Sequence, residues 1–67
     1  MKPIASRKLG WCAVPYAIEI HPSLEGVIII YFGNKEEPLS VSLPKGLTFA
    51  QFMQQYNDCT DAIYFID

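Results

Sequence analysis

The chain is poor in the residues that mark specialised classes of small protein. Its 67 residues include only two cysteines and one histidine. Two cysteines are too few for the disulfide framework that holds small secreted domains together. We therefore expect Cys12 and Cys59 to be small buried thiols, with a single disulfide between them as the alternative.

Long apolar segments are also missing. The longest apolar run covers residues 27–32, whereas a membrane-spanning helix needs about 20 such residues. The first eight residues contain three cations and lack the apolar centre of a secretory signal. These absences predict a protein that works in the reducing cytoplasm and has no contact with a membrane.

Positive charge is scarce outside the first eight residues. The formal net charge is −2, and Lys2, Arg7 and Lys8 all lie at the start of the chain. The remainder holds two lysines against seven carboxylates, so 2 − 7 leaves it at −5. A negatively charged body repels phosphate backbones, which argues against a broad nucleic-acid footprint. A basic arm that contacts phosphates while Trp11 stacks on a base remains the alternative.

No constellation of residues indicates catalysis or metal binding. His21 precedes a proline in a predicted turn, and neither Cys12 nor Cys59 has a neighbouring base to activate it. These three residues also lack the paired spacing of zinc ligands. The sequence therefore predicts a protein that is not an enzyme and that has no cofactor and no metal.

The order of predicted elements is β-β-β-α-β. Residues 1–10 are expected to be an irregular basic segment, followed by one α+β domain over residues 11–67. Strands are predicted at 11–20, 27–32 and 39–43, with a last strand at 62–66. In the first strand one face holds Cys12, Val14, Tyr16, Ile18 and Ile20, and the other holds Trp11, Ala13, Pro15, Ala17 and Glu19. Because Pro15 has no N–H, that strand should lie at an edge or carry a bulge.

A helix is predicted after residue 48. Thr48 followed by Gln51 forms a capping-box pattern, and an apolar stripe continues through Phe49, Phe52, Met53 and Tyr56. Asn57 tolerates the left-handed conformation and is expected to end the helix. The predicted fold is a small four-stranded, mostly antiparallel sheet with this helix packed on one face. Its expected core is Ile18, Ile20, Ile28, Ile30, Val41, Leu43, Phe49, Phe52, Met53, Ile63 and Phe65.

The central strand is apolar on both of its sides. Alternate residues Val27, Ile29 and Tyr31 oppose the equally apolar set Ile28, Ile30 and Phe32. One short helix covers one face of a sheet. The second face is covered by residues 1–10, Trp11 and the loops or by curling of the sheet into a partial barrel, or else by a partner.

The candidate partner-binding residues are aromatic or β-branched, because such side chains anchor interfaces: Trp11, Val27, Ile29, Tyr31 and Tyr64. The leading hypothesis is a non-catalytic binding module that inhibits or adapts a larger protein, as small phage and mobile-element proteins often do. A homodimer is a second way to cover the apolar face. The alternative function is a small nucleic-acid-binding domain that uses the basic arm and an aromatic sheet face.

Overall fold

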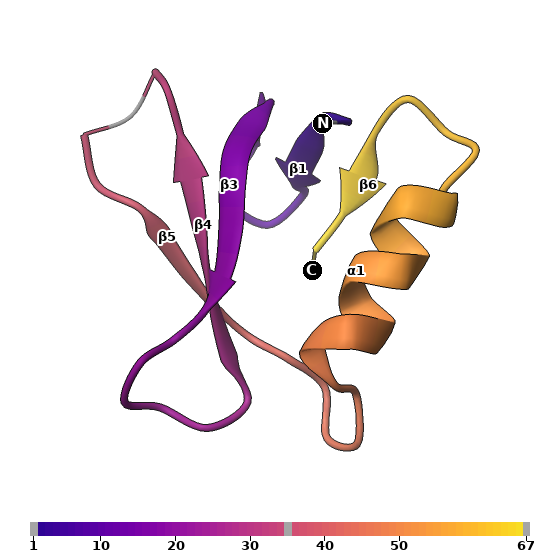
Figure 1. Cartoon of the computed structure of the whole chain (residues 1–67). Coiled ribbons are helices and arrows are strands. Elements are labelled where there is room, and N and C mark those ends of the chain that lie inside the picture. The colour runs from indigo at the N-terminus through magenta and orange to yellow at the C-terminus, as the bar shows by residue number, and fades with distance from the viewer. Residues whose placement is uncertain (1, 35, 67) are drawn as a thin grey trace.

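A computed structural model of the chain describes residues 2–34 and 36–66 (Figure 1). In these residues one helix packs beside two three-stranded sheets. The elements are β1 (Ile4–Ser6), β2 (Trp11–Ala13), β3 (Pro15–Ile20), β4 (Val27–Phe32), β5 (Leu39–Ser42), α1 (Phe49–Asp58) and β6 (Tyr64–Phe65). The α+β class is confirmed, whereas the single four-stranded sheet is wrong.

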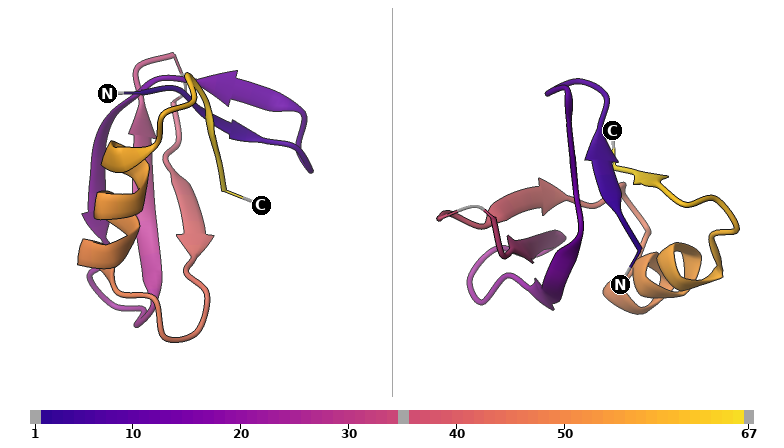
Figure 2. Two further views of the ribbon diagram at one scale, coloured as in Figure 1. Left: turned by 90° about the vertical axis from the view of Figure 1, so that its right-hand side faces the viewer. Right: turned by 90° about the horizontal axis from the view of Figure 1, so that it is seen from above.

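The two sheets are joined by one bent segment of chain. Their strand orders are β2-β1-β6 and β3-β4-β5, and only Val14 separates β2 from β3. β1 is antiparallel to β2 and parallel to β6, while β4 is antiparallel to both of its neighbours. Viewed from above, β3, β4 and β5 lie on one side of the molecule, with α1 and β6 on the other (Figure 2). The bent segment holds one edge strand of each sheet, β2 and β3, and the opposite edges of the two sheets are β6 and β5.

The predicted strand 11–20 bends because of its proline. The β3–β4 register shifts between Pro15 and Ala17, which confirms the expected bulge. Pro15 is fully buried and Ala13 is buried, but beyond the bulge it is Ile18 that packs against the core. The prediction of two continuous faces for this strand is therefore wrong. The extra residue at the bulge shifts the alternation, so odd-numbered side chains point inward before it and even-numbered Ile18 points inward after it.

The N-terminal segment is ordered against the body of the protein. Ile4 in β1 has 0% exposure, and this strand pairs in register with Tyr64 of β6. The Tyr56 hydroxyl donates to the carbonyl oxygen of Lys2. The prediction that residues 1–10 are irregular is wrong, because a three-residue strand has too little periodicity to be recognised and depends on a partner 60 residues away.

The helix begins as its sequence predicts and ends differently. Thr48 Oγ1 accepts from the backbone N–H of Gln51 at 3.1 Å, and Gln51 Oε1 accepts from that of Thr48 at 3.0 Å, which confirms the capping box. At the other end Cys59 is the cap, with φ of −60°, so the left-handed stop at Asn57 is wrong. The Lys2 ammonium donates to the carbonyls of Asn57 and Cys59 instead. A cation there also complements the negative end of the helix dipole.

The core lies between the two sheets and α1. Its buried members are Ile4, Ala13, Ile28, Ile30, Phe32, Phe52 and Tyr56. Three of these, Ile28, Ile30 and Phe52, were predicted, and five further predicted residues pack half-buried against them: Ile18, Val41, Leu43, Phe49 and Met53. Ile63 is half-buried. Ile20 and Phe65 are 60% and 41% exposed, so their core assignment is wrong, because one ends an edge strand and the other belongs to a strand of only two residues.

Candidate protein-binding surface

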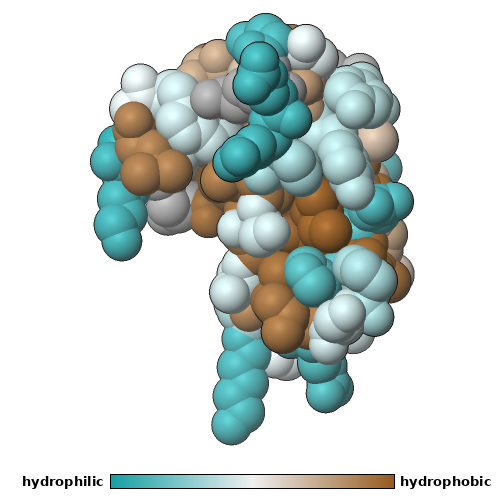
Figure 3. All heavy atoms as spheres, turned by 90° about the vertical axis from the view of Figure 1, so that its left-hand side faces the viewer, coloured by the Kyte–Doolittle hydropathy of each residue, from teal (hydrophilic) through white to brown (hydrophobic). Residues whose placement is uncertain are grey.

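The sheet β3-β4-β5 leaves one of its faces uncovered. Along β4, buried and half-buried residues alternate, and the half-buried ones are Val27, Ile29 and Tyr31. Seen from the side opposite the helix, apolar surface occupies the middle of the molecule, with polar side chains around it (Figure 3). We call Tyr16, Glu19, Val27, Ile29 and Tyr31 the outer face.

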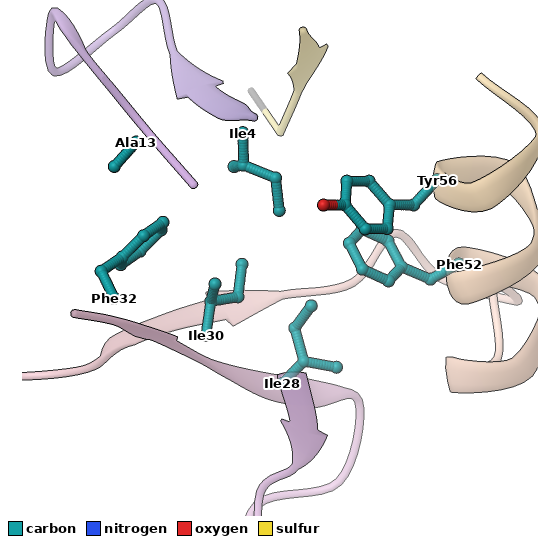
Figure 4. Close-up of a cluster of buried hydrophobic side chains, with 7 residues drawn as sticks. All are labelled: Ile4, Ala13, Ile28, Ile30, Phe32, Phe52 and Tyr56. Carbon is teal, nitrogen blue, oxygen red and sulfur yellow. The ribbon is translucent and has the colours of Figure 1, made fainter. Parts of the chain in front are cut away.

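All the covering elements lie on the other side of this sheet. Ile4 from β1 and Phe52 and Tyr56 from α1 point toward Ile28 and Ile30 (Figure 4). The N-terminal strand therefore joins the helix on the inner face. It does not cover the second face.

The outer face carries a cluster of two tyrosines and a glutamate: Tyr16, Tyr31 and Glu19. The two tyrosine rings lie with centroids 6.0 Å apart at an angle of 37°, and Tyr16 is 67% exposed. The Tyr31 hydroxyl donates to the Glu19 carboxylate. This hydrogen bond, with smaller contributions from partial burial and from the charge of Glu19, holds the pKa of Tyr31 above its usual value.

The structure brings together three of the five predicted partner-binding residues. Val27, Ile29 and Tyr31 share the outer face, whereas Trp11 and Tyr64 pack toward the core. The Trp11 ring packs edge-on against the Phe32 ring, with the two centroids 5.2 Å apart. The centroid of the Tyr64 ring lies 5.7 Å from the ring centroids of both Phe52 and Tyr56.

Tyr16 and Glu19 were missed as neighbours of Tyr31. Strict alternation places them on opposite faces of their strand. The bulge between Pro15 and Ala17 brings both to the outer side. Pro15 is the signal that could have revealed this change, because a bulge inserts one extra residue into the strand.

The basic segment at the start of the chain is folded against the protein. Lys2 is bonded to the end of α1, and the Arg7 guanidinium lies 3.9 Å from the centre of the Phe65 ring. Lys8 lies in the turn between β1 and β2. These cations therefore do not form a freely extending arm.

The cysteines and the histidine are not grouped. Cys12 is an exposed free thiol and Cys59 a half-buried one, so the expectation of two buried thiols is wrong, because the Cys12 side chain lies on the exposed side of β2. His21 Nδ1 accepts from the backbone N–H groups of Ser23 and Leu24 at 3.0 and 2.9 Å, which stabilises its turn. Across residues 2–34 and 36–66, no three acidic, histidine or cysteine side chains gather where they could hold a metal ion. In the same residues no helix has the length and apolarity to cross a membrane.

Comparisons of the chain with protein-family models, with curated proteins and with solved structures found no match.

Proposed function

We propose that the chain is a non-catalytic protein-binding module of the cytoplasm, an inhibitor or adaptor that docks a larger protein on its outer face. The observation that supports this proposal is that the two sides of β4 are equally apolar but are buried to different degrees. Ile28, Ile30 and Phe32 are at most 2% exposed, while Val27, Ile29 and Tyr31 on the other side are only half-buried. Contiguous exposed apolar surface on a small protein usually marks an interaction site.

The composition of the outer face suits a protein partner. Tyr16 and Tyr31 offer large rings with few rotatable bonds, the type of side chain that anchors interfaces. Val27 and Ile29 supply apolar area beside them. Each additional 100 Å² of apolar surface buried there would contribute roughly 2.5 kcal/mol before the costs of association.

The charge on this surface indicates the chemistry of the partner. Glu19 is exposed and lies beside the tyrosine pair, and Glu25 is exposed in the loop that precedes Val27. Complementary charges steer association and select the partner. The partner surface should therefore present apolar side chains bordered by lysine or arginine.

The test combines light scattering with capture from the native cell extract. A tagged wild-type chain that is monomeric should retain one large protein through a high-salt wash, because apolar contacts are not screened. The outer-face variant Tyr16→Ser/Ile29→Ser should lose that protein. The control Gln54→Ser changes an exposed position on α1 and should retain it.

Two outcomes would overturn the proposal. A tight homodimer that retains nothing, and that dissociates in Tyr16→Ser/Ile29→Ser, would assign the outer face to self-association. Retention of nucleic acid that is lost steeply with added salt, and on substitution of Arg7 and Lys8 by alanine, would favour the nucleic-acid-binding function instead.

A further inference from the structure

We propose that the cleft between β5 and β6 accepts an extended segment of a partner protein as an additional β-strand. This site is separate from the outer face, and strand binding there would be a second interaction beyond the function proposed above. Its basis is the backbone of β5 and β6, each of which is an edge strand of its sheet.

β5 has hydrogen-bonding groups directed away from its sheet. Leu43 donates its N–H to the carbonyl of Gly26 at 2.7 Å. In an antiparallel pair, facing residues alternate between bonded and non-bonded pairs. In the register of β4 and β5, Ser40 and Ser42 therefore occupy non-bonded positions. Their N–H and C=O groups point to the free edge of β5.

β6 presents a free edge of the same kind. Tyr64 donates to the carbonyl of Pro3 at 3.0 Å, and Ile66 donates to that of Ala5 at 3.2 Å. A parallel ladder uses alternate residues of each strand. The N–H and C=O of Phe65 therefore point away from β1. Ser42 and Phe65 both line the cleft, so unpaired backbone groups border it on two sides.

The floor of the cleft is apolar. Its volume is 260 Å³, and its lining includes Val41, Leu43, Leu47, Phe52 and Ile66. An extended chain places every second side chain on the same side. A strand in this cleft would bury alternate apolar side chains against the floor while its backbone pairs with β5 or β6. Strand addition of this kind draws affinity from main-chain hydrogen bonds and specificity from such pockets.

The charges beside the cleft restrict the occupant further. Arg7 lies over the ring of Phe65 on one side, and Lys45 is exposed next to Pro44 of the lining. Cations in these positions favour carboxylates on a bound segment. The occupant is thus an extended peptide with alternating apolar residues and acidic residues at its ends.

The probe is a library of short random peptides displayed on phage and selected on the whole protein. Enriched peptides should alternate apolar and polar residues and carry Asp or Glu at their ends. In nuclear magnetic resonance spectra, a synthetic copy should shift the backbone amide signals of Ser42 and Phe65. A copy methylated on alternate backbone nitrogens should bind the wild-type chain at least about tenfold more weakly, because it loses hydrogen bonds to the edge.

Two variants of one residue provide the matched control. Ser42→Pro removes an N–H that points to the free edge, where proline is tolerated, and should weaken binding about tenfold. Ser42→Ala keeps that N–H and should bind as wild type does. If Ser42→Pro does not fold, the methylated peptide still decides the question on the unaltered protein.

Three results would overturn this inference. Selection could enrich no peptide, or methylation could leave affinity unchanged. The shifted amides could be those of Ile29 and Tyr31, which would place the peptide on the outer face. The chain could also form a dimer that Ser42→Ala retains and Ser42→Pro dissociates, which would make a second copy the occupant. Loss of the partner in Tyr16→Ser/Ile29→Ser bears on the outer face alone, so the two proposals fail separately.

Discussion

The inner and outer faces of the sheet β3-β4-β5 differ in what their apolar residues contribute. On the inner face Ile28 and Ile30 are 1% and 0% exposed, and they contact the helix and the N-terminal strand. On the outer face Ile29, from the same strand and of the same type, is only half-buried and lies beside Tyr31. Residues of equal hydrophobicity are therefore fully buried on one side and only half-buried on the other, and we propose that a partner covers the second side.

The largest difference is expected between two isoleucines that are neighbours in β4. Ile30→Ala should lower the free energy of unfolding by about 2–5 kcal/mol, because it removes buried methylenes and leaves a cavity. Ile29→Ala should cost about 1 kcal/mol or less, mainly through strand preference. Urea denaturation of both variants measures the contrast. Equal costs would show that the outer face is part of the structural core.

A second contrast uses two tyrosines. Tyr56→Phe deletes the hydroxyl that donates to the Lys2 carbonyl and should cost about 1–2 kcal/mol. That loss corresponds to a fall in Tm of roughly 4–8 °C for each kcal/mol. Tyr31→Phe breaks only an exposed hydrogen bond and should stay within about 0.5 kcal/mol. Thermal unfolding of the two variants measures the difference, and a larger loss for Tyr31→Phe would reverse the comparison.

The contribution of Tyr56 to stability should depend on alkaline pH. Burial raises the pKa of Tyr56 above its usual 10.0, so the folded state holds this proton more tightly than the unfolded state does. The stability linked to it is complete below pH 10 and is lost as the pH rises above that value. Urea denaturation between pH 9 and pH 12 should show a smaller decline in Tyr56→Phe than in wild type. An unchanged decline in that variant would mean that burial of Tyr56 has no part in it.

The smallest effect is expected from Glu19→Gln. The hydrogen bond to the Glu19 carboxylate is the main cause of the raised pKa of Tyr31, so removing the negative charge should lower that pKa. The free energy of unfolding should change by less than about 0.5 kcal/mol, because the pair is exposed. Titration of the Tyr31 ring signal by nuclear magnetic resonance measures the shift. A pKa of Tyr31 that does not fall would contradict the assigned role of Glu19.

Elements specified by short-range patterns could be predicted from the sequence. The capping box of Thr48 and Gln51 and the β-branched strand β4 are encoded within a few residues, and both are confirmed. β1 contains three residues, too few for a period to be recognised. β6 was predicted as the last strand at 62–66, but its two residues cover only part of that range. Both strands depend on pairing between residues 4 and 64, and the Lys2 cap on α1 depends on contacts of similar range.

The candidate site shows the same limit. Alternation in β4 correctly grouped Val27, Ile29 and Tyr31. It could not place Trp11 and Tyr64, because their sides depend on which sheet each strand joins and on where the chain bends. Alternation alone also could not place Tyr16 beside Tyr31 on the outer face, because its position depends on the bulge after Pro15.

The pairing of β1 with β6 has a consequence for the synthesis of the protein. After β1 is made, a ribosome adds 57 residues before it reaches β6, since β1 ends at Ser6 and β6 begins at Tyr64. Until then Ile4 lacks its neighbour in β6. Lys2 can bind the end of α1 only once Asn57 and Cys59 have been added. The hairpin strands β3, β4 and β5 can pair in the nascent chain, but the core can close only when translation has passed residue 65.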